Sequence, residues 1–366
     1  MTRILACVPL AFDATSYYRA FGVFPNLRKH YHPDLVVDNY TGGGRRTWAD
    51  LLTYDILFMQ RPAYPEWFKL AEYMKGLGKK VWIDHDDNLF DLPPYNRVVD
   101  TYKNPVVRKA MIDMIKLADV VTVSTPALQA YFMDNFAIKS IVIPNALNDE
   151  LTPMAKDYNH LPEVGTLNIP SHRTVEQIIW RGSETHQADL MTHQEQLSNA
   201  MDKRPNTFWS FMGFDPFFVT MNFPETKWKY SASEDVMVFY NNLRSVKAQL
   251  MHVPLIEDGL NACKSNIAWI EATAAGAVTL APNWPEWQKP GIINYNTVEH
   301  YGELLLQPFE RMEERWKLSR DYINENLLLT NVNKMRSEII DRLNPKMIDV
   351  TTKDSKGKEY ITSNQK

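Results

Sequence analysis

The segment from Trp180 to His186 combines a guanidinium with small residues that can bind an anion. It follows an expected strand and leads into an expected helix, where unpaired backbone N–H groups favour negative charge. Gly182 lets the backbone come close to a ligand, and Ser183 or Thr185 can cap the helix. Arg181 adds a planar cation that suits phosphate. The segment predicts an anion site, and the alternative is a capped helix with a surface arginine.

A second segment, Asn261 to Asn266, again lies between an expected strand and an expected helix. Lys264 stands near the helix N-terminus, where a cation is unfavourable unless an anion neutralises it. Glu271 lies two turns further on, in an otherwise apolar stretch where a buried carboxylate needs a hydrogen-bonding partner. We expect Lys264 to bind a phosphate and Glu271 a ribose diol. The alternative partner of Glu271 is a backbone N–H or a neighbouring side chain.

A third cluster is Asp84-His85-Asp86-Asp87, at the end of the expected strand Lys79–Ile83. Three carboxylates and an imidazole shift one another's pKa values or gather hydrogen-bond donors. The spacing matches no specific metal-ligand motif, so no metal is expected. Aspartates after strands also cap helices, which is the structural alternative.

Two further stretches give weaker signals. Tyr17-Tyr18-Arg19 opens the first expected helix and is predicted to face the same crevice, although aromatic pairs are more often core residues. The loop Gly42-Gly43-Gly44-Arg45-Arg46 has neither a Walker lysine nor Rossmann spacing, so we interpret it as a basic surface loop.

Length and composition indicate a folded protein of two to three domains, at about 150 residues per domain. The 366 residues include 40 basic and 44 acidic side chains, and a net charge of −4 requires no polyanionic partner. Cys7 and Cys263 cannot form a disulfide framework, which indicates a reducing compartment. Apolar runs such as Ile4 to Leu10 are too short to cross a bilayer, and no signal-peptide cleavage pattern follows them. We therefore expect a cytoplasmic protein, in the host cytoplasm if a phage encodes it.

Apolar strands alternate with amphipathic helices along most of the chain, which predicts an α/β fold with two Rossmann-like parallel-sheet domains facing a cleft. The expected strands are Arg3–Val8, Asp34–Asp38, Tyr54–Gln60, Lys79–Ile83, Asp119–Val123, Lys139–Ile143, Glu176–Trp180, Thr207–Met212, Thr226–Tyr230, Ala248–Val253 and Ala277–Ala281. The expected helices include Tyr17–Lys29, Glu66–Leu77, Val106–Leu117, Pro126–Phe136, His186–Asp202, Asp235–Arg244 and Ser265–Ala275.

The polar, proline-containing stretch Leu147–Thr174 marks the connection between the domains. We place the first domain at 1–155 and the second at 156–310. Helices at 311–344 are expected to pack back on the first domain, and 345–366 to form a flexible tail. Binding crevices of such sheets lie at the carboxyl ends of the strands, where the segments above are found.

Four stretches, in this order, resemble retaining, nucleotide-sugar-dependent glycosyltransferases of GT-B architecture and the broad family-four type. They are Ala118–Thr125, Ile141–Asn148, Trp180–Gly182 and Lys264–Gly276, the last with Glu271-Ala272-Thr273-Ala274-Ala275-Gly276. Tyr17–Arg19 and Asp84–Asp87 resemble a subgroup common in tailed phages and bacterial polysaccharide loci.

The sequence departs from that family at three places. Cys263 stands where the family has its first glutamate, eight positions before the second, and Lys264-Ser265-Asn266 replaces Gly-Phe-Gly. Ala146 replaces a glycine. The missing glutamate usually contacts the donor sugar, and Asp258 or Asn261 could substitute.

The resemblance implies that a nucleotide sugar binds mainly to the second domain, with no metal and no other cofactor. Arg181 and Lys264 would hold the diphosphate as catalytic cations, and Glu271 would bind the ribose. The other implied donor-binding residues are Gly182, Ser183, Asn261, Ser265 and Asn266. On the acceptor side stand Tyr17, Tyr18, Arg19, Asp84 and Asp87. His85 or Asp86 would orient the acceptor or stabilise the oxocarbenium-like sugar.

The sequence leaves the donor sugar, the base, the acceptor and the oligomeric state open. A phage-type acceptor would be a hydroxymethylated pyrimidine in DNA, extruded from the duplex. Its backbone would meet Arg45, Arg46, Lys227 and Lys229, interleaved with Trp228 and Tyr230. A glycan or lipid-linked acceptor is an equal alternative. The other function classes are a catalytically silent module that binds nucleotide or glycan, and a nucleotide-sugar epimerase of the same fold.

Overall fold

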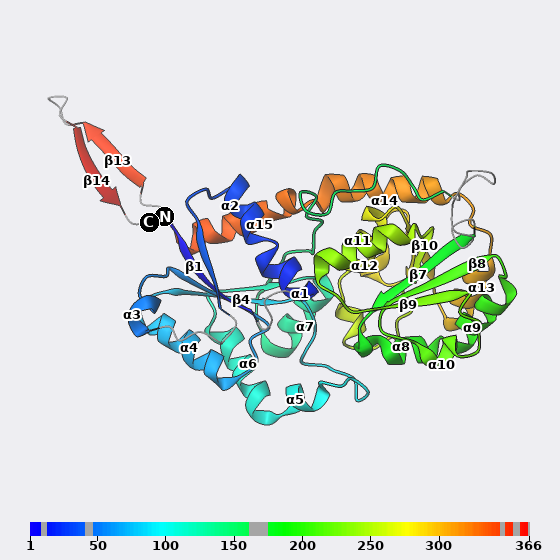
Figure 1. Ribbon diagram of the computed structural model, residues 1–366. Coiled ribbons are helices and arrows are strands. Elements are labelled where there is room, and N and C mark those ends of the chain that lie inside the picture. The colour runs from blue at the N-terminus through cyan, green and yellow to red at the C-terminus, as the bar shows by residue number, and fades with distance from the viewer. Residues whose placement is uncertain (9–12, 41–46, 161–174, 345–347, 354–358, 365–366) are drawn as a thin grey trace.

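The computed structural model describes residues 1–8, 13–40, 47–160, 175–344, 348–353 and 359–364. Two six-stranded parallel sheets, each covered by helices, lie side by side and form the two halves of the molecule (Figure 1). The Gly42–Arg46 loop and most of the connection after His160 lie outside the described residues.

The first sheet has the strand order β2-β1-β3-β4-β5-β6. Its strands are β1 (Arg3–Cys7), β2 (Val36–Tyr40), β3 (Ile56–Gln60), β4 (Lys80–His85), β5 (Val120–Val123) and β6 (Ile141–Val142). Alternation along the strands sends side chains into two separate cores: Ile4 belongs to one apolar cluster and Leu5 to the other. Both faces are therefore buried, which explains the continuous apolar strands.

Helices cover the two faces of this sheet. They are α1 (Ala14–Ser16), the π-helical turn η1 (Tyr17–Phe21), α2 (Phe24–His30), α3 (Trp48–Leu51), α4 (Pro65–Gly76), α5 (Val99–Lys103), α6 (Pro105–Leu117) and α7 (Pro126–Phe136). Local sequence explains the starts of α6 and α7. Asn104 and Thr125 accept hydrogen bonds from backbone N–H groups of the first turn, and a proline follows each of them.

The second sheet has the order β12-β11-β10-β7-β8-β9. Its strands are β7 (Glu176–Gly182), β8 (Thr207–Gly213), β9 (Trp228–Ala232), β10 (Leu250–His252), β11 (Val278–Pro282) and β12 (Ile293–Tyr295). The helices around it are α8 (Gln187–Thr192), α9 (Gln194–Lys203), α10 (Phe217–Thr220), α11 (Val236–Val246), α12 (Ile267–Ala274) and α13 (Val298–Leu306). Three short 3₁₀ turns complete it, namely η3 (Glu184–His186), η4 (Asn261–Cys263) and η5 (Pro285–Trp287). The expected fold class, an α/β fold with two Rossmann-like parallel-sheet domains, is confirmed.

Two chain crossings join the halves, and they lie side by side. Leu147 on the first crossing donates to the carbonyl of Leu327 at 2.8 Å, and Leu329 donates back to Leu147 at 2.7 Å. The last long helix, α15 (Leu329–Leu343), then packs on α2, and Asn333 hydrogen-bonds the Val23 carbonyl and the Asn26 side chain. The chain thus returns to the first domain, as predicted.

Local expectations differ from the structure at several points. The helix expected over Tyr17–Lys29 breaks at Gly22, where a Cβ would lie 2.5 Å from the Tyr17 carbonyl oxygen. The helix expected over His186–Asp202 is divided into η3, α8 and α9.

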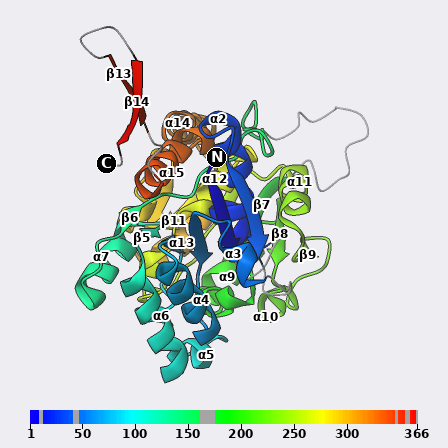
Figure 2. The same ribbon diagram turned by 90° about the vertical axis from the view of Figure 1, so that its left-hand side faces the viewer.

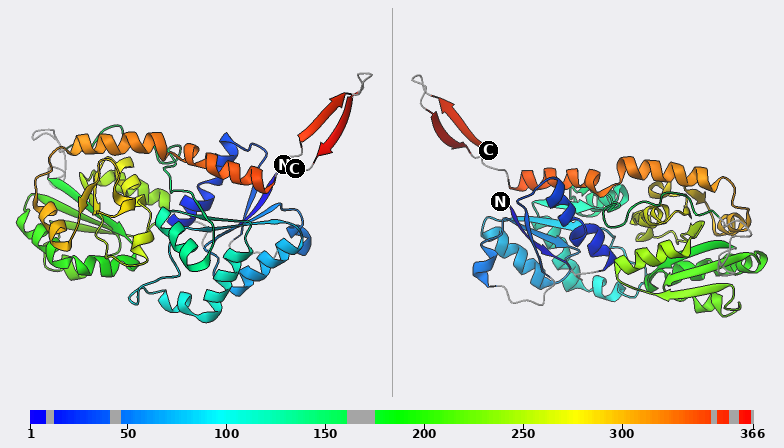
Figure 3. Two further views of the ribbon diagram at one scale, coloured as in Figure 1. Left: turned by 180° about the vertical axis from the view of Figure 1, so that it is seen from behind. Right: turned by 45° about the horizontal axis from the view of Figure 1, so that its top comes forward.

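The helix α14 (Met312–Asn326) packs chiefly on α12 and β11 of the second domain, whereas the helices from residue 311 onward were all expected on the first. It stays on the second, where the Trp316 indole donates to the Thr273 carbonyl of α12 at 2.9 Å. Figure 3 shows α14 and α15 following one another across the two halves.

The tail expectation also differs from the structure. Residues Ile348–Lys353 (β13) and Glu359–Asn364 (β14) pair as antiparallel strands, and the hairpin extends away from the two domains (Figure 2). Both strands are rich in threonine and β-branched or aromatic residues, which favour strand pairing over a frayed coil.

Candidate functional site

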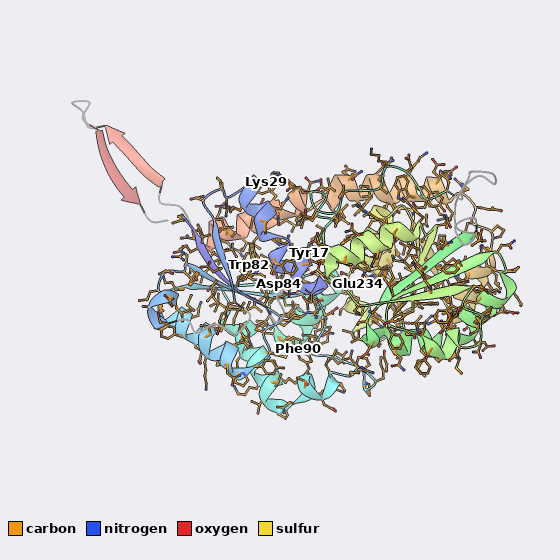
Figure 4. The ribbon with its side chains drawn as sticks, viewed as in Figure 1. Tyr17, Lys29, Trp82, Asp84, Phe90 and Glu234 are labelled. Atoms are coloured by element: carbon orange, nitrogen blue, oxygen red, sulfur yellow. The ribbon has the colours of Figure 1, made fainter. Side chains whose placement is uncertain are left out.

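The carboxyl ends of both sheets meet at a cleft between the domains, and charged residues gather there. Arg61 follows β3, Asp86 and Asp87 follow β4, Arg181 lies near the end of β7, and Lys264 follows η4. A cavity of about 180 Å³ and an adjoining one of about 500 Å³ open at this junction. Both are lined by Arg61, Asp87, Arg181, His186, Lys264 and Glu271. Figure 4 shows Asp84 within the first domain and Glu234, which lines the larger cavity, on the side of the second domain that faces it.

Glu271 is a buried carboxylate of the second domain that lines the cleft, and it has partners within the protein. Arg181 forms an ion pair with it (Nε to Oε2, 2.6 Å), and the Tyr18 hydroxyl donates to Oε1 at 2.7 Å. Burial raises the pKa of Glu271, while Arg181 and the Tyr18 hydroxyl act in the opposite direction. Tyr18 also shares a hydrogen bond with the hydroxyl of Tyr240, so a polar network spans the two domains.

Arg61 belongs to the first domain and holds both aspartates of the cleft. Its Nη2 donates to Oδ2 of Asp86 and to Oδ2 of Asp87, each at 2.7 Å, and its Nε donates to Oδ1 of Asp86. The residue has a φ of 46°, a left-handed conformation that few non-glycine residues adopt. Such strain is concentrated at functional sites.

The two aspartates experience opposite electrostatic environments. Burial and the neighbouring Asp87 raise the pKa of Asp86 to about 6, although Arg61 opposes that shift. Burial also acts to raise the pKa of Asp87, but Lys264, Arg61 and His186 outweigh it and lower that pKa. Asp87 is therefore ionised at neutral pH and is surrounded by cationic groups from both domains.

Several predicted residues lie together in the cleft. The smaller cavity is lined by Tyr18, Asp86, Asp87, Arg181, Lys264, Ser265 and Glu271. The larger cavity is lined by Asp87, Arg181, Gly182, Ser183, Lys264 and Glu271. Ser265 accepts a hydrogen bond from the Asn145 amide of the first domain at 2.8 Å. The cleft therefore combines residues from the expected donor side and the expected acceptor side.

Other predicted residues support the fold and do not line these cavities, which corrects their expected placement. Arg19 and Asp84 form a buried bidentate pair (2.9 and 2.7 Å), and Arg19 also donates to the Ile143 carbonyl at 2.7 Å. Tyr17 packs its ring against Tyr18 and Tyr240. These residues join the first-domain strands and the interface, and none of the three lines either cavity.

His85 is fully buried, and its position excludes contact with an acceptor in this structure. Its ring lies 5.7 Å from that of Phe90 and 5.4 Å from that of Phe132, between centroids, and neither ring nitrogen has a hydrogen-bond partner. Burial lowers the pKa of His85 to about 4. The reason is strand alternation: His85 points to the face opposite Asp84, into the core formed with α6 and α7.

The loop before Lys264 is held by its own side chains. Asn261 donates to Asp189 Oδ1 at 2.9 Å and to the Ile256 carbonyl, and Asn266 donates to the Glu286 carbonyl at 3.2 Å. Asp258 accepts hydrogen bonds from two backbone N–H groups of the same loop. The expectation that Asn261, Asn266 or Asp258 faces a ligand therefore does not match this structure.

Cys263 packs among first-domain residues, within the core cluster that contains Leu128 and Phe132. Thr125 of α7 donates to its carbonyl at 2.9 Å. Cys263 thus anchors the second domain on the first, while Lys264, the next residue, lines the cleft.

Two expectations about the segment after β7 are also corrected. Arg181 and Gly182 are the last residues of the strand itself. Ser183 provides no side-chain cap, because its hydroxyl pairs with that of Thr185 at 2.7 Å. At Gly182 a Cβ would lie 2.7 Å from the indole of Trp180, so the glycine accommodates that ring.

Sequence reasoning missed Arg61 and His186, which line both cavities, and Trp287, which lines the smaller one. Arg61 directly follows a buried strand, so the rule that selected Asp86 would have found it. His186 is the last residue of the expected anion segment Trp180–His186, but its imidazole is not among the side chains expected to line the cleft. Trp287 has no comparable sequence signal.

The residues that the structure describes include no helix with the length and apolar character of a membrane span. They also contain no group of three or more His, Cys, Asp or Glu side chains placed to hold a metal ion.

No model of a known protein family matches this chain, and no curated protein matches it. Solved structures do match. A glycosyltransferase from Rickettsia africae is 15% identical with a TM-score of 0.60, and the match covers 94% of this chain and 99% of that one. HepE from Anabaena, solved in complex with UDP, is 10% identical with a TM-score of 0.61, covering 93% and 100%.

A third match is a putative UDP-N-acetylglucosamine 2-epimerase from Listeria monocytogenes. It is 14% identical with a TM-score of 0.53, and the match covers 98% of this chain and 99% of that one. At such identities these likenesses establish the fold, and the reaction has to be argued from the cleft.

Proposed function

We propose that this chain is a glycosyltransferase that moves a sugar from a nucleotide sugar to an acceptor hydroxyl, with retention of configuration. The observation that carries the proposal is the convergence of Arg181, Lys264 and Glu271 from the second domain on cavities that Arg61, Asp86 and Tyr18 of the first domain also line. Cations and a carboxylate in one cleft match the two polar parts of a nucleotide, its diphosphate and its ribose.

In this proposal Arg181 and Lys264 bind the diphosphate. Negative charge develops on that group as the glycosidic bond breaks, and two fixed cations in a partly buried cleft stabilise it in the transition state. Arg181 is paired with Glu271 in the present structure, so nucleotide binding exchanges this pair for two new ones. Arg181 turns to phosphate, and Glu271 accepts the ribose hydroxyls.

Asp86 and Tyr18 stand on the first-domain side, where the acceptor would bind. Retention requires the acceptor oxygen to approach the sugar from the face that the diphosphate leaves, and residues of both domains line the cavity where this approach would take place. Asp86 would orient the acceptor hydroxyl through the second lone pair of a carboxylate oxygen, while Arg61 fixes the position of the group. UDP is the first nucleotide to test, because one structure of this fold was solved with it.

The acceptor is proposed to be a glycan hydroxyl, and hydroxymethylated phage DNA is the competing candidate. Two of the residues expected to contact DNA have internal roles: Lys227 donates to the Met201 carbonyl at 2.9 Å, and the Trp228 indole donates to the Phe223 carbonyl at 3.1 Å. Arg45 and Arg46 lie outside the described residues.

The first experiment measures thermal stability against UDP, GDP, ADP and their sugar conjugates. Binding at 100 times Kd should stabilise the protein by about 2.7 kcal/mol. A shift with one base family that Lys264→Ala abolishes, while the exposed control Lys203→Ala retains it, supports the donor site. The absence of a shift with every compound would contradict it.

Turnover then separates the function classes. Release of nucleoside diphosphate that depends on a glycan or DNA acceptor, with an anomeric configuration that NMR shows to be retained, supports the transferase. Interconversion of nucleotide sugars without an acceptor would instead identify an epimerase. Binding without either reaction would identify a silent module.

A further inference from the structure

Three carboxylates line the smaller cavity, and two of them have a cation or a hydroxyl beside each oxygen. Glu271 Oε1 accepts a hydrogen bond from the Tyr18 hydroxyl, and Oε2 is ion-paired with Arg181, although the geometry there is not that of a hydrogen bond. Asp86 uses both oxygens for Arg61. Asp87 uses only Oδ2, again for Arg61, and no hydrogen bond within the described part of the chain involves its Oδ1. Asp87 therefore retains an acceptor that a ligand can use.

Asp87 is also the most accessible of the three. Its side chain is 24% exposed, against 10% for Asp86 and 3% for Glu271. Lys264, the proposed diphosphate ligand, lines both cavities with it. Cys263 is buried in a core of the first domain, while Lys264, the next residue, lines the cleft and lowers the pKa of Asp87. Asp87 thus stands beside the place where the diphosphate would bind.

We propose that Asp87 is the residue that recognises the transferred sugar, through hydrogen bonds from its hydroxyls. This inference rests on the proposed function. It assigns Asp87 to the donor site, whereas the sequence analysis expected Asp87 on the acceptor side. The group attached to the diphosphate is the sugar, and a carboxylate accepts hydrogen bonds from adjacent hydroxyls of a hexose. A sugar that lacks or inverts such a hydroxyl leaves a charged oxygen unpaired, which gives strong discrimination.

Arg61 is the positioning residue for this contact. It bonds Oδ2 of Asp87 at 2.7 Å and fixes the carboxylate, while the Asp87 carbonyl accepts from the Leu89 backbone N–H. Arg61 also offsets the charge of Asp87, so a carboxylate can stand close to a diphosphate without preventing its binding. The ionised state that this role requires follows from the lowered pKa of Asp87.

The experiment compares the affinity for a bare nucleoside diphosphate with the affinity for its sugars, by titration calorimetry. The probes are UDP against UDP-glucose, UDP-galactose and UDP-N-acetylglucosamine, and GDP against GDP-mannose. The variant is Asp87→Asn, which keeps the shape and removes the charge. The matched control is Asp91→Asn, which removes the same charge from the same loop at a residue that lines neither cavity.

For the preferred donor, the ratio of the diphosphate Kd to the nucleotide-sugar Kd should fall roughly tenfold or more in Asp87→Asn, as expected for a lost hydrogen bond to a charged group. It should stay unchanged in Asp91→Asn. The affinity for the bare diphosphate should be equal or higher in Asp87→Asn, because an anion has left the cleft.

Two results would overturn the inference. An unchanged ratio, with a raised acceptor KM, would return Asp87 to the acceptor side. An equal loss of affinity for the diphosphate and for the nucleotide sugar would show that Asp87 acts only on the cations of the cleft and does not contact the sugar. If Asp87→Asn fails to fold, Asp87→Glu replaces it, and a changed preference between UDP-glucose and UDP-galactose is then expected. Failure of the proposed function itself looks different, because the wild type would bind no diphosphate.

Discussion

The Tyr18 hydroxyl of the first domain donates a hydrogen bond to the Glu271 carboxylate of the second, across 2.7 Å. Both side chains are buried, and the same carboxylate holds Arg181. The group that would bind a ribose is therefore occupied by the protein in this structure. In the proposed function, a nucleotide would have to replace this contact between domains, which would link occupancy of the cleft to the way the two domains meet.

Replacing Tyr18 with phenylalanine should raise nucleotide affinity by a few fold, because Glu271 loses its internal competitor. The same change should lower the free energy of unfolding by about 1–3 kcal/mol through the loss of a buried hydrogen bond. Calorimetry and urea unfolding measure the two effects. Tyr301→Phe is the control, since it removes a buried hydrogen bond to His252 away from the cleft and should lower stability alone. Weaker nucleotide binding in Tyr18→Phe would contradict the competition.

Replacing Lys264 with alanine should reduce kcat/KM roughly 100-fold, as expected when a charge that stabilises the transition state is lost. Stability should change little, because the side chain lies in the cleft and is not part of either core. Steady-state kinetics with the donor found in the thermal screen provides the measurement. Turnover near the wild-type rate would exclude Lys264 from the diphosphate site.

Replacing Arg19 with methionine should destabilise the protein by about 3–5 kcal/mol, because Asp84 is left as a buried charge without its partner. Asp84→Asn should also destabilise it, but the double variant should recover part of the loss. Urea unfolding of the three variants tests this cycle. A stable Arg19→Met protein that has lost only activity would instead assign Arg19 to the acceptor site.

Replacing His85 with phenylalanine should reduce the decrease in the free energy of unfolding that occurs as the pH is lowered. Burial lowers the pKa of His85 to about 4, so the unfolded chain binds its proton first. The stability contributed by neutral His85 is complete above the unfolded pKa of about 6.5 and is lost as the pH falls toward 4. At pH 5 the loss is roughly 2 kcal/mol.

Unfolding measured at pH 7 and at pH 5 in both proteins isolates this contribution. Burial raises the pKa of Asp86 to about 6 and that of Glu286 to about 7, so protonation of these carboxyls favours the folded state as the pH falls, opposite to the effect of His85. Both residues are present in the wild type and in the variant, so their effect cancels in the comparison. An identical pH dependence in the two proteins would show that His85 is not kept neutral. Burial lowers the pKa of His252 to about 3. Because the variant leaves His252 unchanged, the contribution of His252 to the pH dependence is the same in both proteins and serves as a further control.

The fold and part of the site follow from local sequence. Runs such as Ile4 to Val8 have the apolar continuity of strands buried on both faces, and Asn104 and Thr125 start their helices with caps that are readable in the sequence. Since ligand sites lie at the carboxyl ends of parallel strands, the same local pattern predicts Asp86, Arg181 and Lys264 as site residues. Periodicity and capping depend on residues only a few positions apart.

The tertiary structure decided which of the selected side chains meet. Asp84 and His85 are neighbours in sequence, but strand alternation sends them to different cores, and only Asp86 and Asp87 reach the cleft. Arg61 becomes their partner because β3 and β4 are adjacent in the sheet, a pairing between residues 25 positions apart or more. Cys263 and Lys264 have different surroundings because Cys263 packs in a core of the first domain, while Lys264 lines the cleft. Such relationships depend on strand order and domain packing, which no short stretch of sequence contains.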